Sequence, residues 1–199
     1  ASATQTLTLD TAAPDAVDLL SAGSTQTTGS SAVNVATASS GVSIASDIQA
    51  PSAADIVSVG IVVGSVAAGD SLDFGSSQTL ALDTGSDESG TNLTINSITG
   101  VDYSYAESSD TLVLTKNGGG AFTAAEVDDI VSGILFKTTA EEESGSRTFE
   151  ISYTDDAGNT GASATQTLTL DTAAPDAVDL SSAGSTQTTG SSAVNVATA

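Results

Sequence analysis

The 199-residue sequence contains no cysteine, histidine, tryptophan or methionine. Without cysteine the chain has no disulfide framework and no cysteine-based zinc or redox site. Without histidine it lacks the commonest general base and transition-metal ligand, and a Ser-His-Asp triad is impossible. A carboxylate pair could in principle hydrolyse a glycoside, but three tyrosines and four phenylalanines offer little platform for a sugar. We therefore expect that the protein is not an enzyme.

Basic residues are also scarce, because only Lys116, Lys137 and Arg147 stand against 25 acidic residues, for a formal net charge of −22. Nucleic acids and anionic membrane surfaces require clustered lysine and arginine, so neither is an expected partner. The longest apolar stretch, residues 56–69, is too short and too interrupted to span a bilayer, which takes about 20 residues. We expect no membrane insertion. With 39% apolar residues the chain can still fold, and divalent cations could neutralise its dispersed acids.

The sequence repeats itself at its two ends. Residues 1–38 recur as residues 162–199 with a single change, Leu20 becoming Ser181, at an offset of 161 residues. Repetition at a fixed offset is typical of tandem arrays. We interpret residues 1–10 as the last strand of a preceding repeat, 11–171 as one complete repeat and 172–199 as the start of the next. Neighbouring repeats in the same chain are then the expected partners.

Short alternating segments separated by turn residues predict many β-strands. We expect strands at residues 2–9, 17–20, 33–36, 42–44, 56–63, 71–74, 79–82, 92–98, 101–105, 111–116, 134–138, 147–154 and 165–170. The strand at 56–63 is the most hydrophobic and is expected to be central. This pattern indicates an all-β fold, a Greek-key β-sandwich.

One short helix is expected at residues 124–132. Thr123 and Glu126 have the spacing of a capping box, in which each side chain bonds the other residue's backbone. Three apolar residues then fall on one face, namely Val127, Ile130 and Val131. Gly133 suits the position just beyond the helix.

Acidic residues at the ends of the repeat predict a calcium site. The last two strands should form a hairpin around the loop at 155–159, and in a Greek-key sandwich with an odd strand count the first strand enters at the same end. Ca²⁺ prefers 6–8 oxygen ligands. The expected main site consists of Asp10, Asp15, Asp18, Asp155, Asp156 and Asn159. The alternative is that residues 155–159 form only a hairpin turn.

Two further acidic groups are weaker candidates. Asp171, Asp176 and Asp179 would serve the next repeat, whose loop is missing here, so that site should be incomplete. Asp83, Asp87 and Glu88 could also bind Ca²⁺, although a solvated polar loop over residues 83–91 explains them more simply.

Two stretches resemble known repeats. Residues 151–175 (ISYTDDAGNTGASATQTLTLDTAAP) resemble the closing part of bacterial immunoglobulin-like repeats, and residues 55–153 resemble the cadherin-like repeats of the same surface proteins. In the second stretch the shared features are AGDSLDF, TLVLTK, FTAAEVDDIVSGILF and GSRTFEISYTDDAGN, in that order. These families make up giant adhesins of Gram-negative bacteria, commonly exported by type I secretion.

The resemblance implies an immunoglobulin-like or cadherin-like extender repeat at the cell surface. It would be rigidified by Ca²⁺ at domain junctions through the loop and linker aspartates, and would hold a terminal binding domain away from the cell for adhesion or biofilm formation. One alternative is a self-assembling extracellular filament or matrix, in which a strand such as Thr4–Leu9 completes the sheet of another copy. A second alternative is a module that binds carbohydrate or protein.

Overall fold

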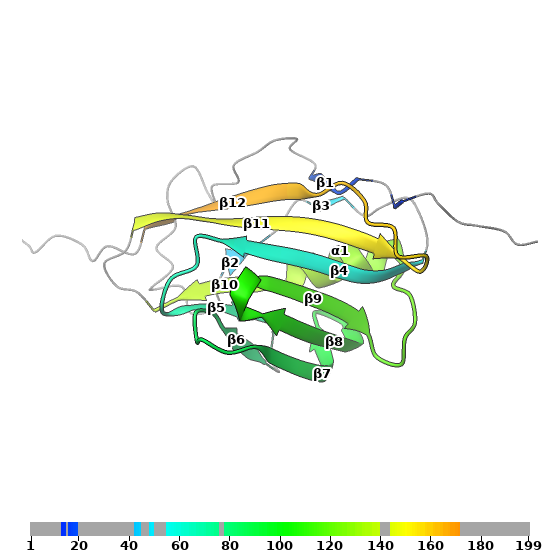
Figure 1. The fold of residues 1–199 in the computed structure, drawn as a ribbon, viewed down its shortest axis with the longest axis horizontal. Coiled ribbons are helices and arrows are strands. Elements are labelled where there is room, and N and C mark those ends of the chain that lie inside the picture. The colour runs from blue at the N-terminus through cyan, green and yellow to red at the C-terminus, as the bar shows by residue number, and fades with distance from the viewer. Residues whose placement is uncertain are drawn as a thin grey trace, which may run out of the picture.

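The chain forms a sandwich of two antiparallel β-sheets with one α-helix, which confirms the predicted fold class (Figure 1). This computed structural model describes residues 13–14, 16–19, 42–44, 48–49, 55–75, 78–139 and 144–171. The strands expected at 2–9 and 33–36, and all of the segments assigned to the preceding repeat (1–10) and the following repeat (172–199), lie outside these residues.

The larger sheet has six strands in the order β12-β11-β4-β9-β8-β7. Their bounds are β4 Ile56–Gly64, β7 Glu88–Ile95, β8 Ile98–Ala106, β9 Thr111–Lys116, β11 Ser144–Asp155 and β12 Ala164–Asp171. A 3-10 turn, η2 (Glu107–Ser109), joins β8 to β9. As predicted, the hydrophobic strand β4 is central, between β11 and β9. The order β4-β9-β8-β7 is that of a Greek key, because three hairpin-connected strands lie beside one reached by a long connection.

The second sheet has four strands in the order β2-β10-β5-β6. Their bounds are β2 Val42–Ser43, β5 Asp70–Asp73, β6 Thr79–Ala81 and β10 Leu135–Thr138. A separate pair joins β1 (Asp18–Leu19) to β3 (Ile48–Gln49). In Figure 1 this pair lies near the start of β12, while the four-stranded sheet and the helix lie behind the larger sheet.

The hydrophobic core fills the space between the two sheets. Alternate residues of β4 and β11 point inward and are buried, as the period-2 pattern predicts. Aromatic contacts join the sheets: the Phe136 and Phe149 rings lie 5.8 Å apart, and the Phe74 and Tyr103 rings 5.2 Å apart. The core is one continuous cluster of buried residues from Val17 to Leu170.

The helix α1 (Ala124–Gly133) begins with the predicted capping box. The Glu126 N–H donates to the Thr123 hydroxyl at 3.3 Å, and the Thr123 N–H donates to the Glu126 carboxylate at 2.7 Å. The position predicted for Gly133 is wrong, since it is the last helical residue and Ile134 caps the helix. A Cβ at residue 133 would lie 2.6 Å from the Asn96 side-chain amide. Any larger residue at this position would have to displace the Asn96 side chain of the β7–β8 turn.

The predicted boundaries of β7 and β8 are also wrong. The polar stretch expected as a loop over 83–91 already enters β7 at Glu88, and the turn lies at Asn96 and Ser97. Gly90 and Asn92 are residues that disfavour a strand, which is why the sequence pattern did not predict one here. In the structure Asn92 has a positive φ of 59°. Gly90 is needed because the Tyr103 ring covers it, and a Cβ would come within 2.3 Å of that ring. The neighbouring strand thus explains a residue that local propensity disfavours.

Candidate metal centre

The loop at residues 155–159 is closed by its own first carboxylate. The Asp155 carboxylate accepts hydrogen bonds from the Asn159 backbone N–H at 2.8 Å and from the Asn159 side-chain amide at 2.9 Å. The Asp155 N–H in turn donates to the Asn159 carbonyl at 3.0 Å. Gly158 has a φ of 84°, a left-handed conformation that glycine adopts without strain. The segment is therefore a tight turn in which Asp155 has a structural role.

The same hydrogen bonds favour the ionised form of Asp155. The side-chain amide of Asn159 is the main reason that the pKa of this carboxyl lies below its ordinary value. Partial burial opposes the effect, and the backbone N–H groups of residues 157–159 reinforce it. Asp156, the next residue, is exposed. The loop thus presents two adjacent carboxylates, one held in place and one free to face solvent.

The chain that precedes the domain reaches this same region. The Val17 N–H donates to the Ala162 carbonyl at 3.0 Å, three residues after the loop. Pro14 and Val17 are both buried. The incoming chain was expected at this end of the sandwich, although the two residues that make the contact are 145 positions apart. The contact brings the linker beside the residues that lead into β12.

The structure brings together only part of the predicted main site. Asp155 and Asn159 are in direct contact and Asp156 is adjacent, but Asp10, Asp15 and the side chain of Asp18 lie outside the described residues. Among the residues that are described, no three acidic, histidine or cysteine side chains are placed to hold one metal ion. The calcium site stays a prediction that depends on the linker carboxylates.

Asp171, the first residue of the site predicted for the next repeat, lies at the other end of the domain. Asp171 is the last residue of β12 and pairs with Ser144. The loop at residues 155–159 precedes β12 and lies at the opposite end of the strand, near its first residue. The side chain of Asp171, and all of Asp176 and Asp179, lie outside the described part of the chain. Asp171 is therefore remote from the loop of its own repeat.

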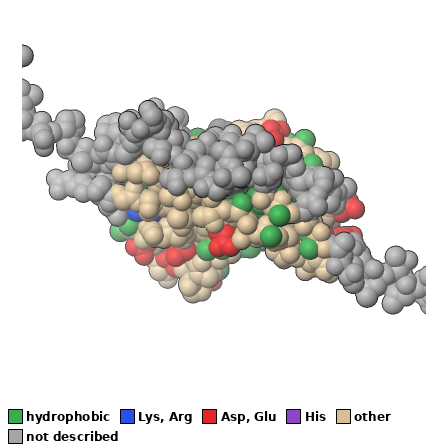
Figure 2. Space-filling view, turned by 90° about the horizontal axis from the view of Figure 1, so that it is seen from above, with side chains coloured by type: hydrophobic (Ala, Val, Ile, Leu, Met, Phe, Trp, Pro, Cys, Tyr) green, Lys and Arg blue, Asp and Glu red, His purple; other side chains and the backbone are tan. Residues whose placement is uncertain are grey.

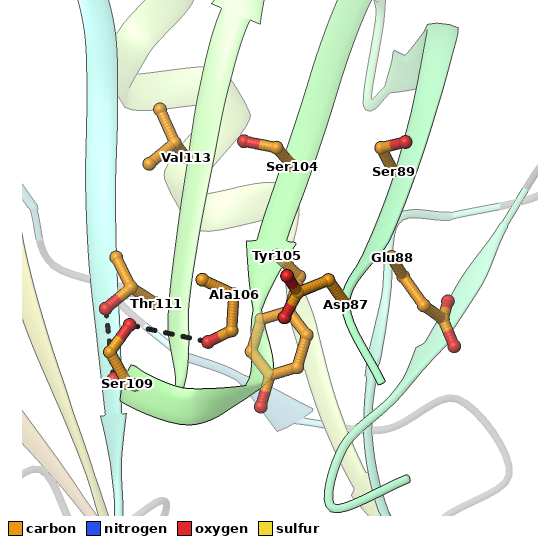
Figure 3. Close-up of a pocket in the computed structure, with 9 residues that line it drawn as sticks. All are labelled: Asp87, Glu88, Ser89, Ser104, Tyr105, Ala106, Ser109, Thr111 and Val113. Carbon is orange, nitrogen blue, oxygen red and sulfur yellow. Dashed lines mark hydrogen bonds between the residues drawn. The ribbon is translucent and has the colours of Figure 1, made fainter. Parts of the chain in front are cut away.

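The third acidic group holds turns together. Asp87 accepts a hydrogen bond from the Glu107 N–H at 2.9 Å, and Glu107 accepts one from the Gly85 N–H at 2.9 Å. Asp83 is exposed and has a φ of 57°. The carboxylates of Asp87 and Glu88 point away from each other (Figure 3). Of the predicted cluster of Asp83, Asp87 and Glu88, Asp87 thus accepts a hydrogen bond from the backbone of the η2 turn.

A shallow hollow of about 370 Å³ lies beside this group, over β7, β8 and β9 (Figure 3). Its polar lining includes Asp87, Ser89, Ser104 and Ser109. The Tyr105 ring that also borders it is buried. The hollow therefore presents hydroxyl and carboxylate groups rather than an aromatic face.

All three basic residues of the chain are engaged in ion pairs within the domain. Lys116 contacts Glu126 at 2.8 Å, Lys137 contacts Asp73, and Arg147 contacts Asp70 at 2.6 Å. The partners are far apart in sequence, by 10, 64 and 77 residues, so sequence inspection missed them. In the view of Figure 2 acidic side chains appear at several places, with only a trace of a basic one. The exterior is strongly acidic.

No helix among the described residues is long and apolar enough to cross a membrane. The chain matches no protein-family model, no curated protein and no solved structure.

Proposed function

We propose that the chain is a structural extender, in which copies of one β-sandwich are joined end to end in a long extracellular protein. The observation that carries this proposal is where the chain enters and leaves the domain. Val17 anchors the incoming chain beside Ala162, before β12 begins, and the outgoing chain leaves at Asp171, where β12 ends. Strand β12 is eight residues long, so these points lie about 25 Å apart. Copies connected in this way extend in a line.

The connection between successive copies is short. Residues 172–174 correspond to residues 11–13 in the repeat, and Pro175 corresponds to the buried Pro14. If each copy folds alike, only three residues separate the end of β12 from the next buried residue, Pro175, and six separate it from the residue that corresponds to Val17. Three residues span at most about 10 Å. Adjacent domains therefore have little room to swing, which suits a rigid spacer.

The charge distribution supports a role for cations in such an array. The three basic side chains are used inside the domain, so facing ends of neighbouring copies have no lysine or arginine to neutralise their carboxylates. Calcium at the junction, held by loop and linker carboxylates, would relieve this repulsion. This part of the proposal rests on the charge balance and on the linker's position beside residue 162.

The cell-surface location and the adhesin context come from the resemblance of residues 55–175 to immunoglobulin-like and cadherin-like repeats. In that context the array holds a binding domain away from a bacterial cell. The near-identity of residues 1–38 and 162–199 fits a mechanical role, because copies in a spacer are interchangeable.

Small-angle X-ray scattering on chains of one, two and four 161-residue periods tests the extender directly. Strand β11 has 12 residues, so a domain is about 40 Å long, and with the connection each added period should lengthen the particle by about 50 Å. A maximum dimension that grows by much less than one domain length per period would contradict the proposal.

Thermal unfolding in millimolar CaCl₂ and in EGTA tests the calcium part separately. Calcium bound only to the folded state raises the midpoint by mass action. Asp156→Asn should reduce this rise without disturbing the turn that Asp155 closes, while Asp129→Asn, at an exposed position on α1, should leave it unchanged. Equal midpoints in both buffers would contradict the calcium part of the proposal. The extender would then be tested by the scattering dimensions alone.

A further inference from the structure

The chain contains a single Asn-Gly dipeptide, Asn117 and Gly118, which lies in the exposed turn after β9. The Gly119 N–H donates to the Lys116 carbonyl at 3.0 Å and closes a four-residue turn. Gly118 is the third residue of this turn and has a φ of 80°, a conformation that favours glycine. The turn explains the glycine, and the glycine exposes the preceding asparagine side chain to attack by the backbone.

This attack is the first step of asparagine deamidation. The Gly118 nitrogen loses its proton to base and bonds to Cγ of Asn117, while the Cγ–Nδ2 bond breaks and ammonia leaves. Water then opens the resulting five-membered succinimide at either of its carbonyls, which yields aspartate or isoaspartate. Glycine permits the ring closure because it has no Cβ beside the attacking nitrogen.

In the folded turn the attacking nitrogen is accessible. The Gly118 N–H forms no hydrogen bond within the part of the chain that the structure describes, and both residues of the dipeptide are exposed. A Cβ built at Gly118 would meet no atom within 4 Å, so base in the solvent can approach. The five other asparagines of the chain precede valine, leucine, serine or threonine, each of which has a side chain beside the nitrogen. Position 117 is therefore the asparagine most open to this reaction.

The Asn117 side chain is tied to Asp102 on β8. Its Nδ2 donates to both oxygens of the Asp102 carboxylate, at 3.0 and 3.1 Å. Asp102 pairs with Thr115, two residues before Asn117, so the amide is directed back along the hairpin. Ring closure instead needs Cγ about 3–3.5 Å from the Gly118 nitrogen. We propose that Asn117 is a site of spontaneous deamidation and that Asp102 sets its rate by restraining the amide.

Deamidation at this position affects two strands. The Asp102 carboxylate also accepts the Asn92 N–H at 2.7 Å, at the bulge of β7, which ends the six-stranded sheet. A carboxylate at position 117 repels Asp102 and has no N–H to donate to it. The reaction therefore weakens the β8–β9 hairpin and the β7 bulge together. This inference does not depend on the extender proposal.

Ageing of the purified full chain in warm, mildly alkaline buffer tests the site, with peptide mapping by mass spectrometry to locate each amide converted to an acid. The first conversion should appear at Asn117. Asp102→Ala should raise its rate about tenfold, because charge-assisted hydrogen bonds no longer restrain the amide. Asp102→Asn retains one acceptor oxygen and should give an intermediate rate. Asp129→Asn removes the same charge at an exposed position on α1 and should leave the rate unchanged.

Two comparisons separate the restraint from other effects. In urea the wild-type and Asp102→Ala chains should react at the same rate, because Asp102 acts only in the folded turn. Asn117→Asp imitates the product and should lower the midpoint of urea unfolding, whereas Asn117→Gln should show no conversion at this position over the same period. Equal rates in the folded wild-type and Asp102→Ala chains would overturn the inference, as would faster conversion at any of the other five asparagines.

Discussion

Replacing Arg147 with methionine should destabilise the domain more than any change at its other two basic residues. Arg147 lies on β11 and Asp70 on β5, so their ion pair joins the two sheets across the core. The Arg147 Nε donates to Asp70 at 2.6 Å, and the Asp70 carboxylate also accepts from the Ala67 N–H at 2.9 Å. Arg147→Met keeps much of the apolar stem but leaves the carboxylate without its counter-charge.

The expected loss follows from burial. Arg147 is 3% exposed and Asp70 is 1% exposed, so water cannot replace the missing guanidinium. Breaking a buried pair from one side costs about 3–5 kcal/mol. For a domain of this size each kcal/mol lowers the melting temperature by about 2–4 °C, so the midpoint should fall by roughly 6–20 °C. Asp70→Leu combined with Arg147→Met should lose less, because no unpaired charge remains.

Urea unfolding followed by circular dichroism measures the difference in the free energy of unfolding. Lys137→Met is the matched control, since it breaks the pair with Asp73 between neighbouring strands, where the two side chains are 29% and 13% exposed. That loss should stay below about 1 kcal/mol. The reasoning would be refuted if Arg147→Met cost no more than Lys137→Met, or if the double variant were less stable than Arg147→Met alone.

Three further changes test local features of the fold by the same measurement. Thr123→Ala should cost about 1 kcal/mol through loss of the helix cap, whereas Thr123→Ser should retain most of the stability. Gly133→Ala, which would ordinarily stabilise a helix, should destabilise this one because the new Cβ meets Asn96, and Asn96→Ala in addition should restore stability. Asp155 has a lowered pKa in the folded state, so its contribution is present above the unfolded-state pKa of about 4 and is lost as the pH falls toward the folded value. Unfolding measured from pH 7 to pH 2 should therefore show a shallower acid loss for Asp155→Asn, and an unchanged profile would count against the hydrogen bonds with Asn159.

The regular parts of the fold could be predicted from local pattern. Residues 111–116 alternate cleanly and form β9 within the expected bounds, and the capping box at Thr123 begins α1 where predicted. The hairpin of β11 and β12 was also predicted, since both strands alternate and a turn sequence separates them. These features depend on residues within one strand or one helical turn, so the sequence contains the signal.

The irregular parts depend on partners distant in sequence. Gly90 and Asn92 disfavour a strand by local propensity, yet a tyrosine ring from β8 covers Gly90. Gly133 resembles a helix terminator, but it is the last helical residue, and the Asn96 side chain of the β7–β8 turn packs directly against it. In both cases tertiary contact overrides local propensity, which is why the predicted boundaries there are wrong.

At the candidate site, the repeat, the excess of acid and the turn at residues 155–159 can all be read from the amino-acid sequence. The folded arrangement is needed to see that Asp155 closes the turn, that Val17 lies beside Ala162, and that every basic side chain pairs inside the domain. Charge and repetition follow from composition and residue order alone. Which groups meet is set by the packing of two sheets, where residues up to 145 positions apart become neighbours.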